Sequence, residues 1–215
     1  MTRENSLDYD RIALDNFRNV IARKKLHEAL NEVVREGDKV SVIVLETPAE
    51  EYAETNISSI EYLLNNGYEG VYMSFQRPYD NICSLFSKNG IDMEKLYIID
   101  NATGFSGEKQ KFQPRCINIT AGKGIEKNVK AIKVALSKLK CKKRFVYIDS
   151  LTTMALHETL SETSRFPEVL IKKLKSKEFE DVKLIFNVAQ QLKGKRYNEN
   201  VSVYADEHLH LGLCT

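Results

Sequence analysis

The sequence predicts an α/β protein with a mostly parallel central sheet and helices on both of its faces. Short apolar runs rich in β-branched residues recur along the chain, and "KVSVIVLE" at residues 39–46 is the clearest of them. Such continuous runs are typical of strands that are buried on both faces. Amphipathic segments separate the runs, and a right-handed crossover helix returns a chain to its sheet in the parallel direction.

The first element is a helix at about residues 7–36, with Leu14, Phe17 and Ile21 on one face and Gly37 at its end. We treat residues 1–36 as an N-terminal helical extension and residues 37–215 as the core domain. Strands are then predicted at residues 39–46, 71–75, 95–100, 144–150 and 182–189. Helices are predicted between them at residues 49–66, 78–89, 123–140 and 161–179.

Two further segments are less regular. The polar stretch at residues 101–115 is expected to be an exposed loop, followed by a short strand at residues 116–120. The closing segment "SVYADEHLHLGL", residues 202–213, is expected to form one or two strands. These last strands could add an antiparallel edge to the sheet.

Composition narrows the classes of function. The chain has a formal net charge of +2, with 42% hydrophobic and 29% charged residues, as is ordinary for a soluble globular protein. This charge balance shows no excess of positive charge that would indicate binding to nucleic acid or to an anionic membrane. No apolar run approaches the roughly 20 residues of a membrane helix. The polar start does not resemble a signal peptide. Four scattered cysteines without a CxxC pair favour free thiols in a reducing cytoplasm.

The connection after the first strand raises the main question about function. A strand, a short loop and a helix form the layout of a phosphate-binding loop, which reads G-x-x-x-x-G-K-[ST]. Its glycines let backbone N–H groups close on the phosphates, its lysine reaches the β and γ phosphates, and its hydroxyl holds magnesium. Here "VLETPAEEYAETN", residues 44–56, has no glycine or lysine and carries Glu46, Glu50, Glu51 and Glu54.

Four stretches of the chain form a recognisable series. They are "SVIVLE" with the helix after it, "NNGYEGVYMSFQRPYDNICSLFSKNGIDMEKLYIID", "RFVYIDSLTTM" and "YADEHLHL". In this order they resemble the RecA-like ATPases, in particular the KaiC- and RadA-related branch common in archaea. The resemblance covers about residues 38–213 and implies a three-layer RecA-like fold with an ATP site. The N-terminal helix lies outside it.

The resemblance shows which functional positions have changed. Laid over the family's phosphate loop, the two glycines fall on Thr47 and Tyr52, the lysine on Ala53 and the hydroxyl residue on Glu54. Two unit charges about 4 Å apart repel by roughly 4 kcal/mol near a protein surface, so this acidic loop should reject a triphosphate.

A second loss concerns catalysis. In KaiC-like relatives two acidic residues follow the second strand, and one of them activates the attacking water. Gln76 and Arg77 stand there, and glutamine cannot take a proton. The Walker B carboxylate survives as Asp149, for which we prefer a structural role over metal binding. The prediction is therefore a protein with no catalytic residues, no cofactor and no metal.

Three other candidate groups remain. His208 and His210 alternate, so a strand would place both on one face, as it would place two metal ligands. Glu207 points to the other face and offers no third ligand, so chance alternation is preferred. Ser150, Thr152 and Thr153 could line a pocket or cap the next helix. The basic residues of "LKGKR" could reach a neighbouring subunit or form a solvated turn; they are Lys193, Lys195 and Arg196.

The predicted function is that of a non-catalytic pseudo-ATPase, a regulatory or scaffold protein in signal transduction. Its expected partner is a protein, either itself in a homo-oligomer or an intact KaiC-like ATPase. The acidic segment 46–54 would meet a basic patch such as 193–196, while the N-terminal helix could seal the first strand's edge or exchange between subunits. Two alternatives stay open: a divergent ATPase using "TAGKG" (120–124), and a nucleic-acid-binding paralogue using "KLKCKKR" (138–144).

Overall fold

The fold is described here from a computed structural model. It describes residues 19–34, 40–106, 112–119, 124–176, 179–190 and 201–212.

A seven-stranded sheet forms the centre of the molecule, and every strand pair in it is parallel. The strand order is β4-β3-β2-β5-β6-β1-β7. The strands are β1 (Ser41–Thr47), β2 (Glu69–Ser74), β3 (Leu96–Asp100), β4 (Cys116–Asn118), β5 (Arg144–Asp149), β6 (Val182–Ala189) and β7 (Glu207–His210). The predicted α/β class with helices on both faces is confirmed, and so are all five of the predicted long strands.

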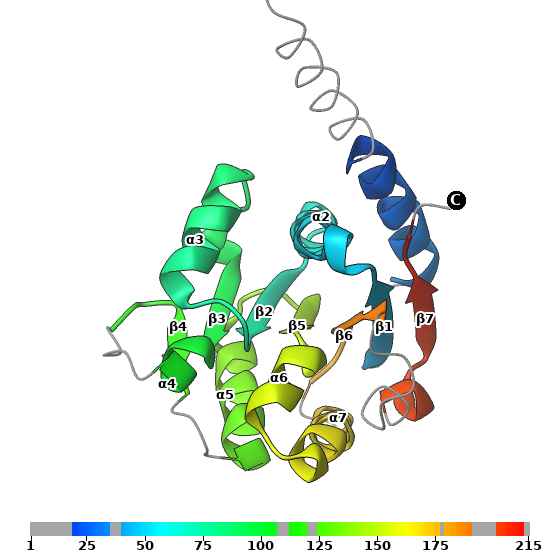
Figure 1. The fold of residues 1–215 in the computed structure, drawn as a ribbon. Helices are drawn as coiled ribbons and strands as arrows, with labels where there is room; N and C mark the ends of the chain where they lie inside the picture. The colour runs from blue at the N-terminus through cyan, green and yellow to red at the C-terminus, as the bar shows by residue number, and fades with distance from the viewer. Residues whose placement is uncertain are drawn as a thin grey trace, which may run out of the picture.

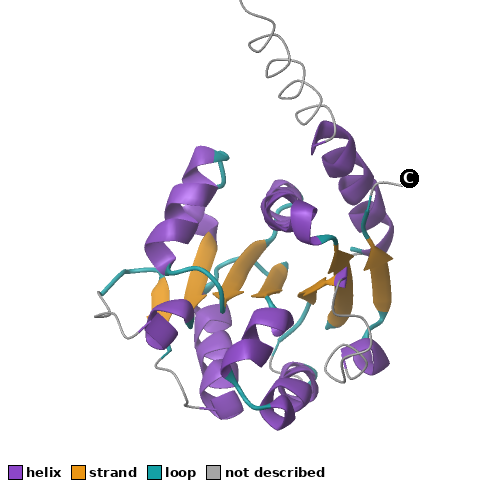
Figure 2. Cartoon of the chain, in the orientation of Figure 1, coloured by secondary structure: helices purple, strands orange, loops and turns teal. Residues whose placement is uncertain are grey.

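The helices divide between the two faces of the sheet (Figures 1 and 2). One face is covered by the N-terminal helix at residues 19–33, α2 (Tyr52–Asn65) and α3 (Tyr79–Lys88). The other face is covered by α5 (Gly124–Lys138), α6 (Leu151–His157), α7 (Leu160–Leu174) and a short helix at residues 201–204. The 3-10 turns η1 (Ala49–Glu51) and η2 (Met93–Lys95) and the short helix α4 (Ala102–Ser106) complete the elements.

The alternation of side chains in β5 fixes which residues enter which half of the core. Val146 and Ile148 belong to the cluster under α5 and α7, whereas Phe145 and Tyr147 belong to the cluster under α2 and α3. This is the division that the sequence predicts for the strand, and all four side chains are fully buried. Gly70 of β2 lies opposite Phe145, and an added Cβ there would come within 2.2 Å of the Phe145 ring.

Two expectations about these segments are wrong. The edge strand β7 runs parallel to β1 and not antiparallel, because it pairs with β1 on the side away from β6. The described part of the closing segment supplies one strand, within the predicted one or two, and its residues 202–204 are helical. The predicted loop at 101–115 begins with α4, and Asn101 and Ala102 are buried there.

The N-terminal helix packs on a face of the sheet and not on an open strand edge. Leu26 and Leu30 are buried in the same cluster as Ile43 and Leu45 of β1. Strand β1 is paired on both sides, with β6 and with β7, so it has no edge for this helix to seal. The part of the predicted helix before residue 19 lies outside the described residues.

Candidate functional site at the carboxyl edge of the sheet

The connection from β1 to α2 is short and tightly wound. Thr47 ends the strand, Pro48 has φ −58° and ψ 146°, and η1 begins at Ala49. The sequence predicts this early start, because proline suits a first turn and the carboxylates of Glu50 and Glu51 favour the positive end of the helix dipole. The helical backbone from Ala49 onward replaces the open turns that a glycine-rich phosphate loop would need.

Two of the four glutamates of this connection have side-chain partners on other elements. Glu54 forms an ion pair with Arg23 of the N-terminal helix. Glu46, near the end of β1, lies with its Oε2 atom 2.9 Å from Nδ1 of His210. Of the other two, Glu50 is exposed and Glu51 is half-buried. The N-terminal helix and β7 thus both contact the acidic connection.

Asp149 lies at the centre of the site and is fully buried at the end of β5. The Tyr72 hydroxyl of the neighbouring strand donates to its Oδ2 atom at 2.5 Å. Tyr52 and Asn56, both on α2, lie beside the same carboxyl group and hold its pKa down through side-chain hydrogen bonding. Among the described residues, the atoms Asp149 Oδ1, Tyr52 Oη and Asn56 Nδ2 are nevertheless buried without a partner of normal geometry.

A chain of buried polar side chains continues from this cluster towards β1. Asn56 Oδ1 accepts from the Tyr147 hydroxyl at 2.8 Å and from Asn187 Nδ2 at 2.7 Å. The Thr47 hydroxyl then donates to Asn187 Oδ1 at 2.8 Å. The ends of β1, β5 and β6 are thus tied to the first turns of α2 by side chains. In a low-dielectric interior such bonds rigidify the elements that they join.

Electrostatics at the cluster favour protonated hydroxyl groups around the carboxyl group. Burial raises the pKa of Asp149, and the donors around it and the positive charge of Arg77 offset this only in part. Burial, followed by the charge of Asp149, raises the pKa of Tyr52 and of Tyr72 well above the ordinary tyrosine value. Both tyrosines therefore remain hydrogen-bond donors at neutral pH.

Gln76 and Arg77, predicted to replace an acidic pair, contribute to the backbone turn and to the charge balance. Backbone N–H groups of Gln76 and Arg77 donate to Ser74 Oγ at 3.3 and 2.9 Å, which closes the turn after β2. The positive charge of the Arg77 side chain acts on Asp149 and lowers the pKa of its carboxyl group.

Asp100 is a site residue that the sequence analysis missed. It ends β3 and accepts three hydrogen bonds: from Tyr79 N at 2.8 Å, from Thr103 N at 2.9 Å and from the Thr103 hydroxyl at 2.7 Å. It joins the start of α3 to α4 and so closes this side of the carboxyl edge. The available signal was its place at the end of the apolar run "LYIID".

The remaining candidates are placed as follows. Ser150 caps α6 by accepting from Thr153 N at 3.1 Å, which agrees with the capping alternative. His208 and His210 are exposed on β7. Lys193, Lys195, Arg196 and most of the "TAGKG" stretch lie outside the described residues.

The basic run "KLKCKKR" lies before β5, at the sheet end opposite to Asp149. Two of its lysines lie over tyrosine rings, Lys138 over Tyr97 and Lys143 over Tyr68. Within the described ranges, no group of three or more His, Cys, Asp or Glu residues could hold a metal ion. None of the helices in these ranges is long and apolar enough to cross a membrane.

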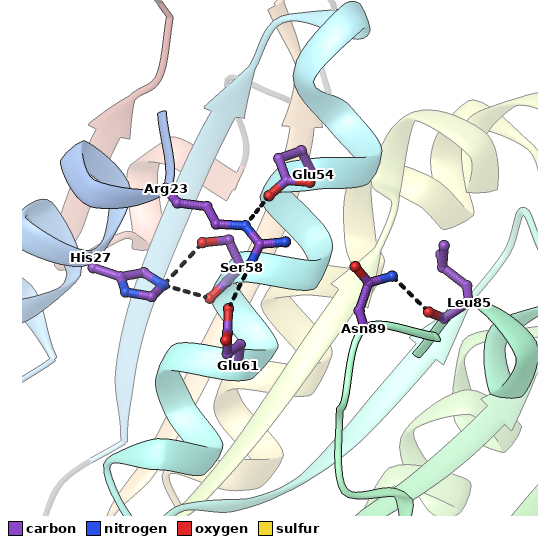
Figure 3. A network of polar contacts seen from close by, with 7 residues as sticks. All are labelled: Arg23, His27, Glu54, Ser58, Glu61, Leu85 and Asn89. Atoms are coloured by element: carbon purple, nitrogen blue, oxygen red, sulfur yellow. Dashed lines mark hydrogen bonds and ion pairs between the residues drawn. The ribbon is translucent and has the colours of Figure 1, made fainter. Parts of the chain in front are cut away.

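A cavity of about 330 Å³ lies between the N-terminal helix, the start of α2 and the residues after β7. Arg23 crosses between the two helices and pairs with Glu54 and with Glu61, as Figure 3 shows. One turn further on, His27 Nε2 lies 3.1 Å from the Ser58 carbonyl oxygen and 2.9 Å from its hydroxyl. These contacts fix the N-terminal helix against α2 beside the acidic connection.

Comparison with known proteins supports the fold and goes no further. No family model matches the chain, and no curated protein matches it. It is similar to the structure of the uncharacterized protein PH0321 from Pyrococcus horikoshii in complex with an unknown peptide, with a TM-score of 0.63 and 17% identity over 85% of this chain and 82% of that one. The KaiC-like protein PH0186 from the same organism has a TM-score of 0.49 and 14% identity over 81% and 72% of the two chains. The chain shares its fold with PH0321.

Proposed function

We propose that this protein is a non-catalytic RecA-like protein, which acts as a regulatory or scaffold module by associating with other protein chains. The observation that carries the proposal is the position of Tyr52. It stands where the phosphate loop of the resembled ATPases has its second glycine, and its buried hydroxyl lies beside the Walker B carboxyl group of Asp149. A side chain of the protein thus occupies a place that a nucleotide phosphate and its metal would need.

Three further features support this proposal. The connection after β1 has neither the lysine nor the glycines of a phosphate cradle. Tyrosine and asparagine side chains and the charge of Arg77 surround Asp149 and lower the pKa of its carboxyl group, so residues of the protein act on this group where a metal would be expected in the resembled ATPases. Gln76 and Arg77 offer no carboxylate to activate water.

The association part of the proposal rests on surface chemistry. Glu50 is exposed and Glu51 half-buried at the carboxyl edge, next to a cavity of about 330 Å³. Complementary charge steers association and selects partners, so a basic partner surface suits this edge. A second copy of the chain can supply such a surface through Lys193, Lys195 and Arg196. That PH0321 was solved with an unknown peptide adds support for a polypeptide partner.

The first test measures nucleotide binding. A ligand that binds only the folded state adds about 2.7 kcal/mol of stability at a hundredfold excess over Kd. For a domain of this size the melting temperature would then rise by roughly 2–4 degrees per kcal/mol. We expect no rise with millimolar ATP and magnesium and no turnover above background. An ATP-dependent rise in the unmodified protein that Asp149→Asn abolishes would favour the divergent-ATPase alternative instead.

The second test measures association by sedimentation of the full chain over a range of protein and salt concentrations. We expect self-association that weakens with salt and falls at least tenfold in the Glu50→Lys, Glu51→Lys variant. Adding Lys193→Glu and Lys195→Glu to that variant should restore association, because the two charge patterns are then exchanged. A chain that stays monomeric at all concentrations, and also fails to capture an intact KaiC-like ATPase, would refute the association part alone.

A further inference from the structure

Two histidines stand side by side on the exposed edge of the sheet. His208 and His210 alternate along β7, so both side chains lie on one face of that strand. Their ring centroids are 6.3 Å apart, and the ring planes differ by 21°. Both residues are exposed, and β7 is the last strand in the sheet order. Solvent therefore reaches the pair directly.

A carboxylate from the neighbouring strand orients one of these rings. Glu46 of β1 is the register partner of His210, so the two side chains share the face on which His208 also lies. Nδ1 of His210 is 2.9 Å from Glu46 Oε2, and the Glu46 side chain is only 18% exposed. A carboxylate that holds one ring nitrogen of a histidine leaves the other nitrogen to coordinate, as in carboxylate–histidine–zinc arrangements.

The two rings lie close enough for a shared metal ion once their side chains rotate. An ion bound in tetrahedral or cis-octahedral geometry at about 2.0–2.1 Å from one nitrogen of each imidazole would hold the two ring centroids roughly 4.5–5.2 Å apart. The observed separation of the centroids is longer, at 6.3 Å. His208 has one other contact, a marginal one of 3.5 Å between Nε2 and the Ser202 carbonyl oxygen. Small rotations of two exposed side chains would complete the geometry.

We propose that His208 and His210 form a surface site for a borderline divalent transition-metal ion such as Zn²⁺, Ni²⁺ or Cu²⁺, with Glu46 as the positioning residue for His210. Imidazole suits these ions, whereas Mg²⁺ and Ca²⁺ prefer oxygen ligands. The two histidines supply two protein ligands, and water fills the other positions.

The site is independent of the proposed association and of the nucleotide cleft. It uses the face of β7 that points towards the short helix at 201–204, whereas Asp149 lies at the end of β5, with β6 and β1 between it and β7. The site shares Glu46 with the acidic segment 46–54, and this residue lies one position before the end of β1. A metal-binding measurement therefore reports on this site whether or not the chain associates.

Isothermal titration calorimetry of the full chain with Ni²⁺, and separately with Zn²⁺, tests the proposal. We expect one ion per chain, with affinity at least tenfold weaker in His208→Ala and in His210→Ala. The double variant should lose this binding, and any residual signal measures other sites such as thiols. Glu46→Gln should weaken binding by about tenfold, because it removes the orienting carboxylate and keeps both ligands.

His157→Ala is the matched control, because it removes one of the four histidines of the chain and none of the proposed ligands. It should bind both ions as the unmodified protein does. Since His208 and His210 are exposed, their variants should keep the melting temperature of the unmodified protein, which separates lost binding from lost folding. The proposal is overturned if neither ion binds at millimolar concentration, or if the double variant binds as tightly as the unmodified protein.

Discussion

At the scale of single residues, Asp149 shows how a buried carboxyl group is surrounded by hydroxyl groups and by a nearby charge. It is fully buried, it accepts a hydrogen bond of 2.5 Å from Tyr72, and Arg77 acts on it only through its charge. Burial is nevertheless the largest influence on its pKa, which is raised. The folded protein therefore holds the Asp149 proton more tightly than the unfolded chain does.

This raised pKa predicts a pH-dependent stability. The contribution of Asp149 is fully present below the ordinary pKa of an aspartate and is lost as the pH rises through the raised pKa. Asp149→Asn removes that loss. The free energy of unfolding of the variant should therefore increase relative to that of the unmodified protein as the pH rises from about 4 through the raised pKa. Each unit of pKa difference corresponds to about 1.4 kcal/mol.

Urea unfolding at a series of pH values measures the difference between the two proteins. The prediction is that this difference in unfolding free energy changes with pH. A difference that is the same at every pH would report only the hydrogen bonds that the substitution exchanges. The exposed Glu207→Gln serves as a control and should show no such gain. A difference that stays flat or shrinks with rising pH would show that Asp149 does not titrate as we infer.

Gly70 gives a second prediction at this scale. Its Cβ position lies 2.2 Å from the ring of Phe145, which is fully buried in the core. Gly70→Ala should lower the free energy of unfolding by about 1–3 kcal/mol through overpacking. Gly90→Asn is the control: Gly90 has φ +72° and no atom within 4 Å of its Cβ position, and asparagine tolerates this conformation. Equal denaturation midpoints for the two variants would contradict the overpacking argument.

At the scale of elements, the long strands could be predicted because each one is a continuous apolar run buried on both faces. The short elements α4 and α6 could not, since five or seven residues carry too little periodicity to be recognised. The direction of β7 could not be predicted from the sequence either, because it depends on which strand β7 pairs with after β6.

The site could be predicted only in outline for a related reason. The positions of Asp149, Gln76 and Arg77 follow from the order of the strands. The contact of Glu46 with His210 joins residues 164 apart, and that of Asn187 with Asn56 joins residues 131 apart. No local pattern encodes such pairs. They arise only when parallel strands bring their carboxyl ends to one edge.

The N-terminal helix gives a prediction at the scale of an element. Leu30 is fully buried against α2 and β1, whereas the ion pair of Arg23 with Glu54 is partly exposed. Leu30→Ala should therefore cost about 2–5 kcal/mol of unfolding free energy, and Arg23→Ala about 1 kcal/mol or less. Val20→Ala, at a site that is 63% exposed, should change little. If Arg23→Ala proves more damaging than Leu30→Ala, charge and not apolar packing holds this helix.

At the scale of the whole molecule, side chains of the protein fill the carboxyl edge of the sheet between β1 and Asp149, where our proposed function places the nucleotide cleft of the resembled ATPases. The early start of the helix, the Tyr52 ring and the polar chain from Asn56 to Thr47 belong together, because all of them lie between β1 and Asp149. Changing one residue should therefore not restore a site. Opening it requires removing the ring and rebuilding the loop at the same time.

A grafted loop tests that conclusion. The variant carries Thr47→Gly, Tyr52→Gly, Ala53→Lys and Glu54→Ser, which together write G-x-x-x-x-G-K-S over residues 47–54. It should lose stability, because Thr47 no longer bonds to Asn187 and Glu54 no longer pairs with Arg23. It should also gain a rise in melting temperature of several degrees with saturating ATP and magnesium, which the unmodified protein lacks.

The matched control is the same graft with Tyr52 retained, which has the new lysine but keeps the ring beside Asp149. It should not respond to ATP, because the space for the phosphates stays filled. Hydrolysis should remain at background in the full graft and should appear only when Gln76→Glu returns a carboxylate to the end of β2. If the graft with Tyr52 responds to ATP as strongly as the full graft, the three changes at positions 47, 53 and 54 are enough for binding, and the tyrosine does not keep nucleotide out.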